Sequence, residues 1–178
     1  MASQQVDPII ADDEVCVRCI HHPLMYSVSK AKLKEESFQP KWNERDASML
    51  RLRYCDEDFC TAHGKGIEIK GSEFIGLATI MPTDVMAVNE WAVSEDSKKR
   101  YDGKEEKETN GMQAHIIYAP MNGKEYVDAS KPVYTESDIS LPMHVDLRYD
   151  KALNDDVKTR IRHYARQLAA RAAFIKKV

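Results

Sequence analysis

The clearest hydrophobic pattern in this chain runs through its C-terminal segment. Apolar side chains recur there at gaps of three or four residues, at Val157, Ile161, Tyr164, Leu168, Ala172 and Ile175. An α-helix has about 3.6 residues per turn, so this spacing aligns them in one narrow stripe. Lys158, Arg162 and Arg166 follow one another at gaps of four along a different side. The pattern predicts a basic amphipathic helix over residues 153–177.

Upstream of this helix, short β-branched and alternating runs predict strands. They cover residues 15–20, 49–54, 67–70, 74–80, 112–118 and 143–149, with weaker candidates at 126–127 and 133–134. The 67–70 and 74–80 runs are expected to form a hairpin, and the acidic residues 56–58 begin a brief helix. Because strands come first and the long helix last, we expect an α+β fold. Its largely antiparallel sheet, of about five to seven strands, would pack against the long C-terminal amphipathic helix.

Two polar segments are expected to lie outside the core. Residues 1–14 are rich in Ser, Gln and acidic side chains, which predicts a flexible leader. Residues 94–111 combine charges of both signs with almost no apolar anchor, which predicts an exposed charged loop. A chain of 178 residues is long enough for one core and short for two. Residues 15–178 are therefore expected to form a single domain.

Composition narrows the class of protein and its compartment. Hydrophobic residues make up 43% and charged residues 31%, a profile typical of soluble globular proteins. No apolar run approaches the roughly 20 residues that cross a bilayer. The first residues lack the cationic and apolar regions of a signal peptide. These features predict a cytoplasmic protein that does not associate with membranes.

Charge is distributed unevenly along the chain. Residues 151–178 hold eight Lys or Arg against two Asp, a local charge of +6, whereas the remainder holds 18 basic and 27 acidic residues, or −9. Like charges spaced four apart on a helix repel one another by a few tenths of a kcal/mol. Lys158, Arg162 and Arg166 therefore favour an anionic counterpart, either the acidic body of this chain or a separate partner.

The four cysteines raise the question of a zinc site. Cys16 and Cys19 have the C-x-x-C spacing, and further ligands would come from His21, His22, Cys55, Cys60 and His63. Residues three apart on a strand point to opposite faces, so Cys16 and Cys19 would not reach the same ion. We therefore expect free thiols and no cofactor, with zinc as the alternative.

His115 and His144 are the candidate catalytic residues. Each lies in an expected strand, and two histidines on neighbouring strands can act as acid and base on a phosphodiester. Two-histidine phosphoesterases carry Ser or Thr two residues after each histidine, where this chain has Ile117 and Asp146. The alternative is that both are strand histidines whose hydrogen bonds are satisfied at the sheet edge.

Arginines within the expected strands are candidate anion ligands. Arg18, Arg51 and Arg53 each must face water, pair with a carboxylate or hold an anion. Arg51 and Arg53 would share one face of their strand, where they could hold a phosphate or pair with carboxylates across the sheet. The glycine-rich nucleotide loops, the H-E-x-x-H zinc motif and the G-x-S-x-G nucleophile elbow are absent from the sequence.

Three functions follow from these features. The first is an intracellular interaction or regulatory protein that binds an acidic protein or other polyanionic partner through Lys158, Arg162 and Arg166. The second is a histidine-based enzyme that acts on a phosphate-bearing substrate, such as a nucleotide or an RNA end, which leaves enzymatic activity undecided. The third is a nucleic-acid-binding module, although the isoelectric point of 6.1 lies far below the value of about 9 typical of such domains.

Overall fold

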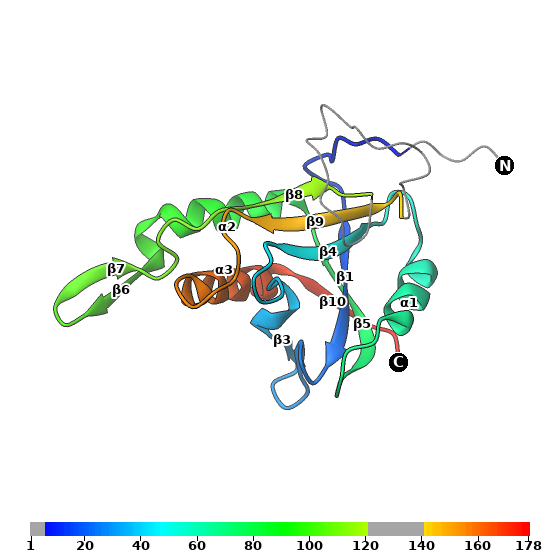
Figure 1. Cartoon of the computed structure of the whole chain (residues 1–178), viewed down its shortest axis with the longest axis horizontal. Coiled ribbons are helices and arrows are strands. Elements are labelled where there is room, and N and C mark those ends of the chain that lie inside the picture. The colour runs from blue at the N-terminus through cyan, green and yellow to red at the C-terminus, as the bar shows by residue number, and fades with distance from the viewer. Residues whose placement is uncertain (1–5, 121–140) are drawn as a thin grey trace.

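A six-stranded antiparallel sheet forms the centre of the molecule (Figure 1). The computed structural model describes residues 6–120 and 141–178. The strands lie in the order β10, β5, β1, β4, β9, β8. Their bounds are Cys16–His22 (β1), Asp46–Arg51 (β4), Glu73–Ile80 (β5), Ala114–Tyr118 (β8), His144–Tyr149 (β9) and Ala173–Lys176 (β10). The expected α+β fold with a largely antiparallel sheet is therefore confirmed.

The helices cover both faces of this sheet. α2 (Pro82–Val93) and α3 (Lys158–Arg171) lie on one face, where Val88 and Leu168 join strand residues such as Ile20 in the larger core (Figure 1). α1 (Glu57–Gly66) lies on the other face, where Cys60 joins a smaller core with Leu77. The smaller elements are β2 (Tyr26–Ser27), β3 (Lys32–Leu33), β6 (Lys98–Tyr101), β7 (Lys104–Lys107) and the 3₁₀ turns η1 (Glu35–Ser37) and η2 (Glu95–Ser97).

The C-terminal helix is shorter than the expected 153–177. α3 ends at Arg171, and the chain then pairs as β10 with the free edge of β5, with Ile175 opposite Leu77. Gly76 makes this approach possible, because a Cβ atom there would lie 2.3 Å from the Ile175 carbonyl oxygen. The unpaired edge of β5 provides backbone partners that a longer helix would leave unsatisfied. Pairing across the chain therefore overrides the helical periodicity.

α2 is an element that the hydrophobic pattern did not predict. Pro82 stands at its first turn, and the Asp84 carboxylate accepts a hydrogen bond from the Met81 backbone N–H at 2.8 Å. Its buried residues Val85, Val88 and Ala92 are spaced by three and four. Pro and Asp in the first turn and apolar residues at gaps of three and four are sequence signals of a helix, so α2 could have been predicted from the sequence.

Two strand expectations differ from the structure. Residues 67–70 do not form a hairpin with β5; the bridge between Ile69 and Ser72 joins the segments, while β5 pairs with β1 and β10. β4 ends at Arg51 rather than continuing to residue 54, and the chain then turns. The weaker strands expected at 126–127 and 133–134 lie outside the described residues.

The two polar segments both contain residues that the structure describes, whereas residues 1–5 of the expected leader lie outside the described residues. Residues 6–14 are fastened to the body through Glu14, whose carboxylate is buried against the Arg51 guanidinium. Within 94–111 the chain forms η2 and then the β6–β7 hairpin, which extends away from the sheet (Figure 1). None of the helices in the described part of the chain has the length and apolarity that a bilayer-spanning helix requires.

Candidate functional site

A pocket opens where β1 and β4 separate in the middle of the sheet. The two strands pair at Cys16 with Arg51 and at Val17 with Leu50, and from there β4 continues its pairing with β9. β1 remains paired with β5 along its whole length. The resulting cavity has a volume of about 500 Å³, which is within the range of about 300–1,000 Å³ typical of ligand pockets.

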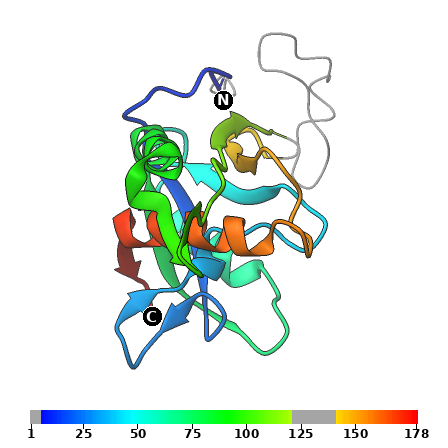
Figure 2. The same cartoon turned by 90° about the vertical axis from the view of Figure 1, so that its left-hand side faces the viewer.

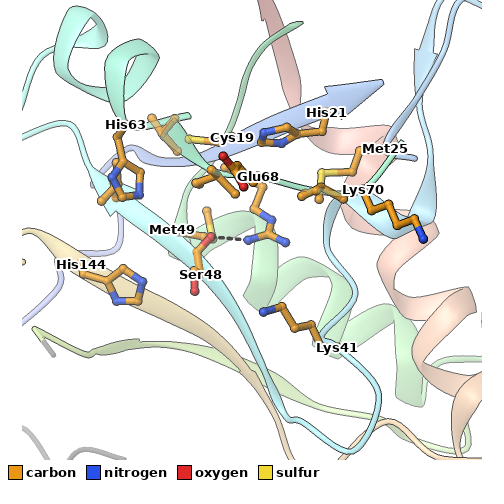
Figure 3. A pocket seen from close by; sticks show the side chains of 15 residues that line it. Cys19, His21, Met25, Lys41, Ser48, Met49, His63, Glu68, Lys70 and His144 are labelled. Atoms are coloured by element: carbon orange, nitrogen blue, oxygen red, sulfur yellow. Dashed lines mark hydrogen bonds between the residues drawn. The ribbon is translucent and has the colours of Figure 1, made fainter. Parts of the chain in front are cut away.

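The polar lining of this cavity defines what we call the histidine pocket (Figure 3). The residues are Arg18, His21, Lys41, His63, Lys70 and His144. Glu68 also lines the pocket and provides a carboxylate among these cations. Lys41, Glu68 and Lys70 are exposed. Three permanent cations and one carboxylate give the lining a net charge of +2 when the imidazoles are neutral.

Arg18 spans the gap between the separated strands. Its Nε donates to the Ser37 carbonyl oxygen at 2.9 Å, and its Nη1 donates to the Ser48 carbonyl oxygen at 2.7 Å (dashed line in Figure 3). Burial lowers the pKa of Arg18, yet a guanidinium remains protonated in proteins. Among the described residues, no carboxylate oxygen lies within 4.0 Å of it. Arg18 is therefore a half-buried cation at the pocket wall that lacks a close counterion in the described chain.

His144 lies on β9 with one ring nitrogen engaged. Its Nδ1 lies 2.7 Å from the Ala119 carbonyl oxygen; because a carbonyl only accepts, Nδ1 carries the hydrogen and Nε2 holds a lone pair. Nε2 is buried with no hydrogen-bond partner among the described residues. Burial lowers the pKa of His144 to about 4. The imidazole is therefore neutral near pH 7.

Asp146 follows two residues later on the same strand face. Its Oδ1 lies 3.8 Å from the His144 Nε2. Burial, with the nearby Asp46 as a second cause, raises the pKa of Asp146 to about 7. Between about pH 4 and pH 7, the folded pair consequently holds one titratable proton on the Asp146 carboxyl, while His144 keeps only its Nδ1 hydrogen and stays neutral.

Two further imidazoles line the pocket. The His21 Nε2 lies 3.2 Å from the Gly64 carbonyl oxygen, and its Nδ1 is buried without a partner in the described chain. His63, on α1, is half-buried, and burial lowers its pKa. A buried acceptor left without a donor costs about 1–3 kcal/mol. The His21 Nδ1 and the His144 Nε2 are therefore both available to accept a hydrogen bond.

The structure does not bring His115 close to His144. His115 is exposed on β8 and pairs in register with Arg148, which lies four residues along β9 from His144. At about 3.3 Å per residue, this offset is about 13 Å along the strand, although both histidines share one face of the sheet. His115 also lies outside the histidine pocket.

Arg51 and Arg53 lie outside the pocket as well. Arg51 donates to both Glu14 carboxylate oxygens and to the carbonyl oxygens of Asp7 and Ile9, which occupies at least four of its five N–H groups. Arg53 is exposed beyond the end of β4. Both guanidinium groups lie over the Tyr54 ring, at 4.7 Å and 5.6 Å from its centroid. Their expected role in anion binding stays a prediction.

The three basic residues of α3 contact carboxylates of this chain. Lys158 lies 3.0 Å from Asp155, whereas Arg162 and Arg166 share Glu35, at 2.6 Å and 3.4 Å. Glu35 of the acidic body therefore provides counter-charge for the two arginines, whereas Asp155 belongs to the basic segment itself. The lysine and the two arginines nevertheless remain half or more exposed.

The cysteines occupy separate places. Cys16 belongs to the core beneath α2 and α3, whereas Cys19 belongs to the core beneath α1, as expected for residues on opposite strand faces. The Sγ atoms of Cys55 and Cys60 lie 3.6 Å apart. Within residues 6–120 and 141–178, no group of three or more His, Cys, Asp or Glu side chains is placed to hold a metal ion.

Comparison with known proteins returns no matching family model, no matching curated protein and no matching solved structure. The function therefore has to be inferred from the geometry of the site. Arg18 carried a signal in the sequence, because it interrupts an apolar strand. The contributions of Lys41 and Lys70 had no comparable signal, since surface lysines are common and only the fold brings these two together.

Proposed function

We propose that this protein binds a small phosphate-bearing molecule of nucleotide size in the histidine pocket. The observation that carries the proposal is the guanidinium of Arg18, which faces the cavity with two backbone carbonyls as acceptors and no close carboxylate in the described chain. Arginine is suited to phosphate because its N–H groups form a planar fork. The net charge of +2 matches a phosphate monoester, which carries about −1.5 to −2 at pH 7.

The imidazoles support a chemical step on the same ligand. We propose His144 and His63 as the acid–base pair of a phosphoester hydrolase, the enzyme class expected as an alternative from the sequence. In this proposal His63 replaces His115 as the second histidine. Arg18 replaces Arg51 and Arg53 as the phosphate ligand. In such a reaction, one imidazole takes a proton from the attacking water and the other gives a proton to the leaving oxygen. Both side chains line one cavity and lie on the same side of it in Figure 3. A bound phosphate would raise the low pKa of His144 towards neutrality, because a nearby negative charge favours the protonated form.

A cytoplasmic location is part of the proposal. All four cysteines are free thiols, and two of them lie with their sulfur atoms 3.6 Å apart. Thiols in such proximity persist more readily in the reducing conditions of the cytoplasm than in a secretory compartment.

Calorimetric titration with inorganic phosphate, AMP and 2′,3′-cyclic AMP tests the binding. Lys41→Gln with Lys70→Gln removes two exposed cations of the pocket without disturbing the core, and is expected to weaken binding about tenfold. Arg53→Gln, with its exposed side chain outside the pocket, is the control and should leave affinity unchanged. Equal effects of the pocket and control variants, or no binding of any of the three ligands to the wild-type protein, would contradict the proposal.

Hydrolysis is measured separately on 2′,3′-cyclic AMP by chromatography of the products. His144→Asn is expected to lower turnover by about 10²-fold or more while AMP binding persists. If His115→Asn loses turnover while His144→Asn keeps full activity, the catalytic histidine is His115 on β8 and the proposed role of His144 is wrong.

A further inference from the structure

A second group of cations lies outside the histidine pocket, around the β2–β3 hairpin that follows β1 and the facing side of α3. The β2–β3 hairpin provides Lys30, Lys32 and Lys34, and α3 provides Arg162 and Arg166. Figure 2 shows this hairpin below α3. Together they line a cavity of about 680 Å³, which we call the cationic groove. It shares no lining residue with the histidine pocket.

Glu35 is the carboxylate within this groove. Although burial opposes its ionisation, hydrogen bonds from Arg162 and Arg166 hold the pKa of Glu35 down at about 2. The Arg162 Nε lies 2.6 Å and the Arg166 Nη2 lies 3.4 Å from the same Glu35 oxygen. One carboxylate therefore serves two guanidiniums, and the lining of five cations and Glu35 keeps a net charge of +4.

We infer that the cationic groove docks an acidic segment of a partner protein, and that Glu35 occupies a carboxylate position within it in the free protein. This inference is independent of the histidine pocket. It extends the partner-binding role expected of α3 by adding the hairpin lysines and an internal competitor. The side chains of Arg162 and Arg166 are 60% and 50% exposed, so an incoming carboxylate can reach both.

Apolar side chains in the groove favour a protein segment over a nucleic-acid strand. Val28 is 66% exposed there and would contact apolar side chains of an acidic peptide; Pro23 also lines the groove. Tyr26 lines the groove, but its ring stacks on Phe174 at 4.6 Å, which covers one of the two faces that a base would use.

The test is fluorescence anisotropy with a short labelled peptide of glutamates and spaced leucines, in about 50 mM NaCl, where surface charges are weakly screened. Arg162→Glu with Arg166→Glu should weaken binding about tenfold or more. The matched control is Arg160→Glu with Arg171→Glu, which reverses two charges of the same helix outside the groove and should change affinity by less than about threefold.

Glu35→Gln provides the second and sharper arm. Removing the internal competitor should tighten peptide binding by about threefold, because both arginines become available. Circular dichroism verifies that the variant is folded. Weaker or unchanged binding by Glu35→Gln overturns the inference, since a purely structural ion pair would behave in that way. Tighter binding of an oligothymidylate of equal charge than of the peptide, with the same dependence on Arg162 and Arg166, overturns it in favour of nucleic acid.

Discussion

The buried ion pair between Glu14 and Arg51 allows a quantitative test of how the N-terminal segment is held. The side chains are 4% and 0% exposed, and two parallel bonds join them, at 2.5 Å from Nε and 2.8 Å from Nη2. Glu14→Gln keeps the shape of the side chain and removes its charge. The Arg51 guanidinium would then remain buried without its counterion.

Removing one partner of a buried pair costs about 3–5 kcal/mol. The carbonyl oxygens of Asp7 and Ile9 continue to accept hydrogen bonds from Arg51, so the lower end of this range applies, about 3 kcal/mol. For a chain of this size, each kcal/mol lowers the melting temperature by about 2–4 °C. We therefore expect Glu14→Gln to melt about 6–12 °C below the wild-type protein.

Urea denaturation at pH 7, followed by circular dichroism, measures the free energy of unfolding. Asp13→Asn is the matched control, because it removes a charge from the exposed neighbouring residue and should change stability by less than about 0.5 kcal/mol. The double variant Glu14→Leu with Arg51→Met replaces both partners by apolar side chains and should be more stable than Glu14→Gln. If Glu14→Gln and Asp13→Asn have the same stability, the segment is not anchored by this pair.

Two further predictions concern the sheet. Gly76→Ala would place a Cβ atom 2.3 Å from the Ile175 carbonyl oxygen, so it should destabilise the protein by about 1–3 kcal/mol and accelerate amide hydrogen exchange in β10. Gly66→Ala is the control, because no atom lies within 4 Å of the added carbon. Equal protection of the β10 amides in both variants would refute the packing argument. The second prediction concerns the pair of His144 and Asp146. Between about pH 4 and pH 6.5 the folded state holds one titratable proton on Asp146, and the unfolded state holds one on His144. The two states bind equal numbers of protons, so this pair does not make the free energy of unfolding depend on pH. In Asp146→Asn, His144 gains its second proton only in the unfolded state over this range, so the free energy of unfolding should rise with pH by up to about 1.4 kcal/mol per unit. Urea titrations at several pH values measure this slope, and a flat profile would refute the assignment.

Local pattern was sufficient where an element's own residues decide its form. The β-branched run at the start of β1, the alternation in β9 and the acidic first turn of α1 each indicated the right element in the right place. The C-terminal apolar stripe likewise predicted α3, whose residues Ile161, Tyr164 and Leu168 are fully buried. Such signals depend on neighbours one to four residues apart, so they are visible without a fold.

The composition of the candidate site was only partly visible in this way. Arg18 and His144 were recognisable as unusual side chains within apolar strands. Their convergence with Lys41 and His63 depends on the separation of β1 from β4, which no local pattern encodes. The internal carboxylate of the cationic groove, Glu35, was equally hidden, since a short polar segment places it against a helix more than 120 residues later.

By itself, the amino-acid sequence determined the class of fold, the order of most strands along the chain and the presence of a basic amphipathic helix. Only the tertiary structure decided where that helix stops, which strands are neighbours and which charges are already balanced within the chain. The physical reason is that backbone edges and buried charges take their partners from whatever lies beside them in space. The helix α3 stops at Arg171 because the following residues pair as β10 with the open edge of β5. The Arg51 side chain is buried because the Glu14 carboxylate beside it supplies its counterion.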